Sequence, residues 1–565
     1  AQAGSDHLAA GHFCPVYTSA LPTKKRAFWE ALITAVLLCS KKHDRLPPVA
    51  ETTFGSIIGH QKELRNGAIV CEEFIGIPYA EPPRRFQPPV PWSQDFPNRR
   101  FEANSFGNAC MQFDPHQSIL VGSEDCLFAN VWRPAGATSL HGLPVVIWIH
   151  GGGFSFGAGE AVQLPSSRLF NGCHMAASTA VIVVSLNYRL NILGFATFAK
   201  SSNQFDTHWG LKDQREGMRW VHRHLAAFGG DAGLVTLLGQ SAGAGSVYYH
   251  MVTPESTGLF RAVIMQSGPY LAFPGSLAYP GSFQANQTAS LAVAAGCKEP
   301  SIRECLESAD AAKLVGLSTL AQGWGMSIDG IELQESPHLI VRRESFSAVP
   351  ALLGYTSDES TLFTYLRFHS PVNRSEVRDF LAALFPPTTD SEGMGRLDRV
   401  IDFYAAKFPG PDLRRALSAF EGDMMFICAA VASAVANSAS APTFLYQFDT
   451  RPSCPPPIPW VPGAYHSLEV PYVFGNSPRQ NFGAGCGFSK SQQDMSDAMQ
   501  VRWINFVKGL SPQGTHLPLS PSWPHLKKET MEIMRITEAG LMVEALDPEQ
   551  EKLCDRWPEF SSIFQ

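Results

Sequence analysis

Residues 234–246 of the chain read LVTLLGQSAGAGS, and this stretch decides the fold. A short apolar run typical of a β-strand ends abruptly at Gly239, and a helix-compatible segment begins near Val247. The pattern predicts a strand, a very tight turn and a helix, with Ser241 at the apex of the turn. The small neighbours of Ser241 permit such a turn, because larger side chains would clash with the strand and the helix. Ser241 is therefore a candidate nucleophile.

The same glycine and serine pattern occurs a second time, as GFSFG at residues 153–157. Its serine, Ser155, lies in a glycine-rich loop with no helix signal immediately after it. The pattern alone is a weak motif, because it identifies a nucleophile only between a strand and a helix. Ser241 has both neighbours, so Ser241 is the stronger candidate.

The composition is that of a large globular α/β protein. The chain has 565 residues, of which 45% are hydrophobic and 17% charged, enough for an ample core. Apolar runs bounded by turn residues alternate with helical patterns such as Leu211 to Phe228, which predicts a mostly parallel sheet covered on both faces. These runs are residues 145–149, 180–186, 234–238, 262–266, 349–353 and 444–448. We expect one domain over residues 48–565.

Charge and hydropathy exclude several partners. The net charge of −7 does not favour nucleic acid, and we find no internal repeat and no apolar stretch of membrane-spanning length. The sequence therefore gives no firm evidence of a membrane contact, and nothing in it indicates an oligomeric state.

Residues 1–47 are predicted to be an N-terminal extension. Lys24, Lys25 and Arg26 precede an apolar stretch from Ala27 to Cys39, as in a secretory signal or a short signal-anchor. The alternative is an ordinary amphipathic helix, which Glu30 within the stretch favours. We expect a secreted protein or one of the secretory-pathway lumen. The possible glycosylation acceptors are Asn286 and Asn373.

The 12 cysteines are too few for a disulfide scaffold in a chain of this length, and they show no zinc spacing. Two local pairs are close enough in sequence to be bridged. Cys110 and Cys126 flank a 15-residue loop, and Cys297 and Cys305 flank a short polar segment. Each bridge would stabilise the fold by roughly 2–4 kcal/mol.

A serine hydrolase also needs a base, an acid and donors for the oxyanion. Gly152 and Gly153 follow a predicted strand directly, and with Ala242 they could supply backbone N–H groups. The base candidate is His466, on a loop well after the serine. The acid candidate is Glu359, with its neighbour Asp358 as the rival.

The order serine, acid, histidine is the one expected of an α/β-hydrolase. The chain resembles the type-B carboxylesterases of the carboxylesterase/cholinesterase family over about residues 52–560. The matching motifs are FIGIPYAEPP (74–83), RF (85–86), SEDCL (123–127), NVW (130–132), HGGGF (150–154), NYR (187–189), DQ (213–214), FGGD (228–231), GQSAG (239–243), QSG (266–268), DE (358–359), GAYH (463–466) and WINF (503–506). The resemblance implies an α/β-hydrolase fold.

The same resemblance implies specific roles within the site. It assigns the acid to Glu359 rather than Asp358, and the oxyanion donors to Gly152, Gly153 and Ala242. It supports both cysteine pairings, and it makes Ser267 similar to a buried serine that supports the family's site, although Ser267 could equally be an ordinary strand-end residue.

Two features depart from the family. Gln240 stands where many members have Glu, and the loop from Met111 to Asp125 contains no tryptophan, whereas cholinesterases hold choline there through an aromatic ring. The loop is also short for the lid of an interfacially activated lipase.

We therefore expect a serine carboxylic ester hydrolase that acts through an acyl-enzyme on medium-sized uncharged small-molecule esters. It requires no metal and no cofactor. The alternatives are a lipase-like member of the family and a non-catalytic adhesion protein of the neuroligin type, which typically lacks a member of the triad.

Overall fold

The computed structural model of the chain separates into two units, Ala1–Pro47 and Pro48–Gln565. The expected signal segment lies outside the described residues, as does most of the proline-rich segment before His466. The described residues are 46–64, 69–114, 118–160, 169–268, 278–298, 300–321, 323–343, 346–384, 391–451, 461–476, 487–514 and 519–555.

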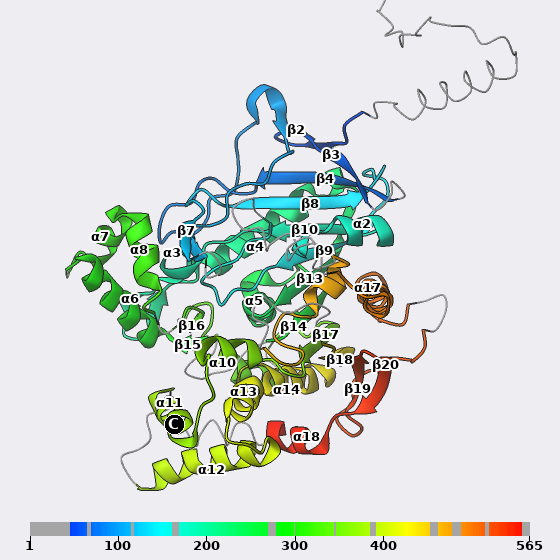
Figure 1. The fold of residues 1–565 in the computed structure, drawn as a ribbon. Coiled ribbons are helices and arrows are strands. Elements are labelled where there is room, and N and C mark those ends of the chain that lie inside the picture. Colours follow the sequence, from blue (N-terminus) through cyan, green and yellow to red (C-terminus); the bar gives the residue numbers. More distant parts are fainter. Residues whose placement is uncertain are drawn as a thin grey trace, which may run out of the picture. The chain divides into compact units, whose positions relative to one another are not determined.

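An eleven-stranded sheet forms the centre of this unit, with the order β20-β19-β18-β17-β14-β13-β9-β10-β8-β4-β3 (Figure 1). Its strands are β3 (His60–Leu64), β4 (Ile69–Pro78), β8 (Phe128–Pro134), β9 (Leu143–Ile149), β10 (Ile182–Leu186), β13 (Gly230–Gln240), β14 (Ala262–Gln266), β17 (Ala351–Thr356), β18 (Thr443–Asp449), β19 (Glu532–Thr537) and β20 (Gly540–Ala545). The six apolar runs singled out in the sequence correspond to six neighbouring strands, from β10 to β18.

The middle of the sheet, from β10 to β19, is entirely parallel. Strands β8, β4 and β3 at one edge and β20 at the other pair antiparallel. The expectation of a mostly parallel sheet is confirmed, while its antiparallel edges were not predicted.

Helices cover both faces of the sheet, because alternate side chains of each strand point to opposite sides. In β9, Val145, Ile147 and Ile149 join one apolar cluster, whereas Val146 and Trp148 join the other. The first cluster includes side chains of α4 (Trp209–His224), α5 (Ala242–Val252) and α14 (Cys428–Ser438), and the second those of α2 (Cys173–Thr179), α15 (Val470–Phe474) and α17 (Lys490–Gly509). In such a sheet the carboxyl ends of the parallel strands lie at the same edge, which is where α/β proteins of this kind bind their ligands.

Further helices and short strands surround these layers. The helices are α3 (Asn191–Phe195), α6 (Gly281–Ala295), α7 (Ile302–Ser308), α8 (Ala311–Ser318), α9 (Pro337–Arg342), α10 (Thr361–Arg367), α11 (Arg374–Leu384), α12 (Ser391–Lys407), α13 (Arg414–Gly422) and α18 (Pro548–Asp555). The short strands are β1 (Val49–Thr52), β2 (Gly55–Ile58), β5 (Arg100–Glu102), β6 (Gln112–Asp114), β7 (Ile119–Val121), β11 (Phe198–Ser201), β12 (Gln204–Asp206), β15 (Ala278–Pro280) and β16 (Met326–Ile328). The sequons at Asn286, on α6, and Asn373, just before α11, are both exposed.

Four disulfides are present among the described residues. Cys110–Cys126 and Cys297–Cys305 are the two pairs expected from the sequence. The other two, Cys71–Cys173 and Cys428–Cys554, join residues 102 and 126 positions apart. These two pairs were not predicted from the sequence, because only the tertiary fold brings such distant residues together.

One helical run corrects the expectation that no apolar stretch could span a membrane. Helices α13 and α14 continue into one another through the π-helical segment η5 (Asp423–Ile427), which makes one helix of 25 residues, Arg414–Ser438. Its most apolar window has a mean hydropathy of 1.5 and is 72% buried within the protein. Core helices share this length and composition, so the run is weak evidence for a membrane span.

Candidate active site

Ser241 lies at the junction of β13 and α5, as the sequence predicts. Its backbone has φ 57° and ψ −126°, a conformation that is strained for any residue but glycine. A Cβ atom on Gly239 would overlap the carbonyl oxygen of Gly243, and one on Gly243 would overlap that of Ile149. The turn therefore closes only because both positions are glycine, and it holds Ser241 partly exposed at its apex.

The histidine and the glutamate singled out in the sequence are in direct contact. His466 Nδ1 lies 2.6 Å from Glu359 Oε2, and both side chains are buried. Glu359 Oε1 accepts a hydrogen bond of 2.8 Å from the backbone N–H of Thr356, at the end of β17. These contacts fix the imidazole with Nδ1 as the donor and leave Nε2 as an acceptor.

The rival acid, Asp358, faces other groups. Its Oδ1 pairs with Arg415 Nη2 at 2.8 Å, and its Oδ2 accepts from the backbone N–H of Ala464 at 2.9 Å. Asp358 thereby ties the loop that carries His466 to the end of β17, while Glu359 contacts the imidazole.

The second ring nitrogen of His466, Nε2, is not hydrogen-bonded to Ser241. His466 Nε2 lies 3.1 Å from Gln240 Nε2, and the Ser241 hydroxyl makes no hydrogen bond to any described residue. Such contacts are often loose in an enzyme without substrate. Gln240 departs from the residue of many family members, but its contact with the base could not be predicted from the sequence.

Two aromatic rings pack against the same imidazole. The Phe426 ring lies 4.4 Å from it and the Phe363 ring 5.1 Å, measured between ring centroids. Phe426 belongs to the π-helical segment η5, an irregularity that is frequent at functional sites. Neither ring could be predicted from the sequence, because a π-helical turn has no readable sequence pattern and Phe363, on α10, is distant from His466 in the sequence.

The segment that follows β9, residues 150–157, is rich in glycine and is called the glycine loop below. It lies against Ser241. A Cβ atom on Gly151 would lie 2.9 Å from Ser241 Cβ, so the two segments are in close contact. The N–H groups of Gly152, Gly153 and Ala242 donate no hydrogen bond to any described residue. They are therefore free to bind a negatively charged oxygen.

His150 supports the start of this loop. Its Nδ1–H donates to the Gly151 carbonyl at 2.8 Å, and its ring stacks on Tyr188 with 4.3 Å between centroids. Burial lowers the pKa of His150 to about 4, so this imidazole is neutral at physiological pH.

A second buried carboxyl, that of Glu469, lies close enough to Glu359 for their charges to interact. Glu469 is fully buried, and its Oε1 accepts from Gln266 Nε2 at 3.0 Å, while its Oε2 has no partner among the described residues. Burial, and the negative charge of Glu359, raise the pKa of Glu469 to about 8. Ser267, which follows Gln266 in the sequence, is also buried, and its hydroxyl has no hydrogen-bond partner within the part of the chain that the structure describes. Glu469 was not predicted, since three residues after His466 it reads as an ordinary helix-start acid.

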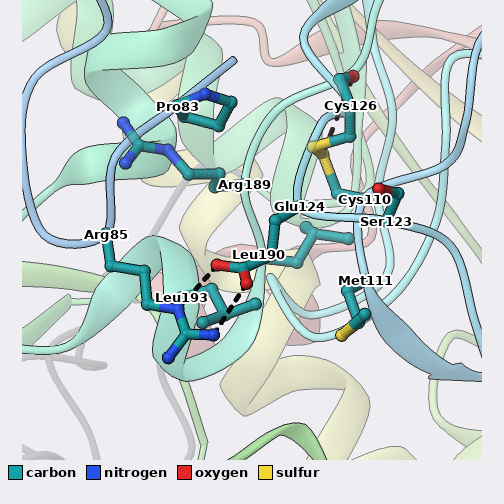
Figure 2. Close-up of a pocket in the computed structure, with 10 residues that line it drawn as sticks. All are labelled: Pro83, Arg85, Cys110, Met111, Ser123, Glu124, Cys126, Arg189, Leu190 and Leu193. Atoms are coloured by element: carbon teal, nitrogen blue, oxygen red, sulfur yellow. Dashed lines mark hydrogen bonds and ion pairs between the residues drawn. A yellow bond between two sulfur atoms is a disulfide. The ribbon is translucent and has the colours of Figure 1, made fainter. Parts of the chain in front are cut away.

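Figure 2 shows a small hollow at the root of the Cys110–Cys126 loop. It is bordered by this disulfide and by the ion pair of Arg85 with Glu124, whose Nε and Oε2 atoms lie 2.7 Å apart. No candidate catalytic residue lines it.

Among the described residues, one group of metal-ligating side chains is close enough to share an ion: Cys71, Glu73 and Cys173. Its two cysteines are joined to each other as a disulfide, so their sulfur atoms are not thiolate ligands.

Comparisons with known proteins agree with this geometry. The family model described as "Carboxylesterase family" matches residues 46–554. The para-nitrobenzyl esterase of Bacillus subtilis (strain 168) is 30% identical over an alignment of 531 residues, and the match covers 89% of this chain and 97% of that protein. The cholinesterase of Mus musculus is 31% identical over an alignment of 549 residues, and the match covers 87% of this chain and 84% of that protein. Among solved structures, PNB esterase matches with a TM-score of 0.71 and 30% identity, covering 89% of this chain and 98% of that one.

The fold and these matches define an α/β-hydrolase that is a serine ester hydrolase. More particularly, the chain belongs to the carboxylesterase family. The resemblance drawn from the sequence motifs is thereby confirmed.

Proposed function

We propose that the chain hydrolyses carboxylic esters through a triad of Ser241, Glu359 and His466. The observation that carries the proposal is the 2.6 Å contact between Glu359 and His466, beside a serine held at the apex of a strained turn. The three free N–H groups of Gly152, Gly153 and Ala242 support an oxyanion hole at the same place.

The reaction begins when the Ser241 hydroxyl replaces the Gln240 amide at His466 Nε2. His466 takes the serine proton, Ser241 attacks the ester carbonyl, and the developing oxyanion binds the free N–H groups. The protonated His466 then gives its proton to the leaving alcohol. Glu359 holds the imidazole in the required tautomer and stabilises its positive charge. A water molecule activated by His466 releases the acid in the second half of the reaction.

The substrate we propose is a medium-sized, uncharged carboxylic ester. The rings of Phe363 and Phe426 give the surroundings of the base an apolar character, which suits a neutral acyl or alcohol group. One relative is named para-nitrobenzyl esterase, and others are named carboxylesterases. The absence of tryptophan between Met111 and Asp125 is the reason to expect poor use of choline esters.

We further propose that the protein is exported and glycosylated at Asn286 and Asn373. Four disulfides fit an oxidising compartment, and both asparagines are exposed. Mass mapping of glycopeptides from protein expressed through a secretory pathway would test both statements.

The function is tested with purified protein and a panel of p-nitrophenyl esters. We expect turnover of the butyrate ester by wild type and none above background by Ser241→Ala. A sharp rise in activity above the solubility limit of a triglyceride would instead favour the lipase-like alternative. Full turnover by Ser241→Ala would contradict the proposal.

A further inference from the structure

A buried glutamine connects the Cys110–Cys126 loop to the glycine loop of the active site. Gln112, in β6, has no exposed surface. Its Oε1 accepts from the backbone N–H of Gly157 at 2.6 Å, and its Nε2 donates to the Gly157 carbonyl at 2.9 Å. The same Nε2 donates to the Cys110 carbonyl at 2.8 Å. One side chain thus satisfies both backbone groups of Gly157.

Gly157 in turn packs against the beginning of the glycine loop. A Cβ atom on Gly157 would lie 2.5 Å from His150 Nδ1 and 2.6 Å from the Gly151 carbonyl oxygen. A Cβ atom on Gly152 would overlap the carbonyl oxygen of Phe156, the residue before Gly157. The two ends of the loop are therefore in direct contact, and a shift of Gly157 would displace the segment that carries the oxyanion donors.

We propose that Gln112 is a positioning residue for the oxyanion hole: by holding both backbone groups of Gly157, it sets the direction of the free N–H groups of Gly152 and Gly153. This inference rests on the proposed function. The hydrogen bonds of the Gln112 side chain go to backbone groups of Cys110 and Gly157, and not to the nucleophile. It acts through the loop, whose fold depends on contacts between its two ends.

Other contacts hold the strand that carries Gln112 in place. The Cys110–Cys126 disulfide closes its loop, and Asn191 Nδ2 donates to the Met111 carbonyl at 2.9 Å. The backbone N–H of Asn191 also donates to the carbonyl of Phe154, within the glycine loop, at 2.7 Å. Cys110 and Met111 line the same hollow as the Arg85–Glu124 ion pair (Figure 2). Gln112 therefore links this strand to the glycine loop, which would lose two hydrogen bonds at Gly157 without it.

The test compares Gln112→Met and Gln112→Glu with wild type. Methionine fills nearly the same volume without the hydrogen bonds. Glutamate, which complete burial keeps protonated, retains an acceptor for the Gly157 N–H and one of the two donated bonds. Loss of one oxyanion donor typically costs about 10²–10³ in rate, and misdirected donors should cost less. We expect kcat for p-nitrophenyl butyrate to fall about 10- to 100-fold in Gln112→Met, with KM within about twofold. Gln112→Glu should fall between Gln112→Met and wild type.

Two further measurements separate positioning from a loss of folded protein. Activity is expressed per Ser241 titrated to its end point with a fluorophosphonate, so that only folded enzyme is counted. The affinity for a trifluoromethyl ketone, whose adduct places an oxyanion in the hole, should weaken by about the same factor as kcat/KM. The matched control is Gln284→Met, which removes a buried glutamine bonded to the Gly323 carbonyl, far from the loop in sequence. This control should change stability without changing kcat.

An unchanged kcat per titrated site in Gln112→Met would overturn the inference, as would a ketone affinity equal to that of wild type. These outcomes would leave the proposed function intact, provided that Ser241→Ala is inactive. Turnover by Ser241→Ala would instead overturn the proposed function.

Discussion

Replacing Glu469 by glutamine should stabilise the protein, and the gain should grow with pH. The pKa of Glu469 is raised from 4.5 to about 8 by burial and by the nearby charge of Glu359. Between these two pH values the native protein holds a proton that the unfolded chain has lost. The stability of wild type therefore falls as pH rises through this window, by up to about 1.4 kcal/mol for each pH unit. The glutamine side chain of the variant resembles the protonated acid in shape and keeps an oxygen for the Gln266 amide. Because glutamine does not ionise, the stability of the variant should not fall in this way as pH rises.

The assay is urea unfolding of both proteins at pH 5, 6, 7 and 8. The difference in unfolding free energy, Glu469→Gln minus wild type, should become more positive at each step, and the trend should level off above about pH 8. The matched control is Asp423→Asn, since burial raises the pKa of Asp423 only to about 6. Its difference should therefore stop growing near pH 6. A difference for Glu469→Gln that is constant or decreases over the range would show that the native protein does not hold this proton.

Three other predictions concern the triad, the disulfides and the substrate. Glu359→Gln should lower kcat by about 10⁴, because the imidazole loses its orienting charge, whereas Asp358→Asn should keep kcat within about tenfold; steady-state kinetics at neutral pH would show whether the two carboxylates differ as expected. Removing the Cys71–Cys173 bridge by a double serine substitution should lower the free energy of unfolding by roughly 2–4 kcal/mol, and equal urea midpoints for the variant and wild type would contradict its stabilising role. Butyrylcholine should be hydrolysed at least about tenfold less efficiently than an uncharged butyrate ester, since no tryptophan in the Cys110–Cys126 loop can bind its cation; comparable kcat/KM values would show that another group recognises choline.

The parts of this fold that are local in sequence could be predicted from it. The run 234–238, the glycines and Ser241 specify a strand, a turn and a helix within a few residues, and β13 and α5 lie there. The buried strands were recognisable because both of their faces are apolar, as in β9. The His466 and Glu359 candidates followed from motif order, and the structure brings these two side chains into contact.

The parts that depend on distant contacts could not be predicted in this way. Cys428 and Cys554 become neighbours only after the C-terminal helix α18 packs against α14. Phe426 reaches His466 through a π-helical turn, and Gln112 reaches Gly157 across 45 positions of sequence. A buried glutamine carries no sign of its partner, because an amide can bond to any backbone group that the fold brings near.

The central claim is that Ser241, and not the serine of the second motif, is the nucleophile. The most direct measurement is labelling with a fluorophosphonate probe, followed by mass spectrometry of the modified peptide and a count of probe per protein. We expect one probe per chain, on Ser241, with no labelling of Ser241→Ala and full labelling of Ser155→Ala. Stoichiometric labelling of Ser241→Ala, or a modified peptide that contains Ser155 instead, would contradict it.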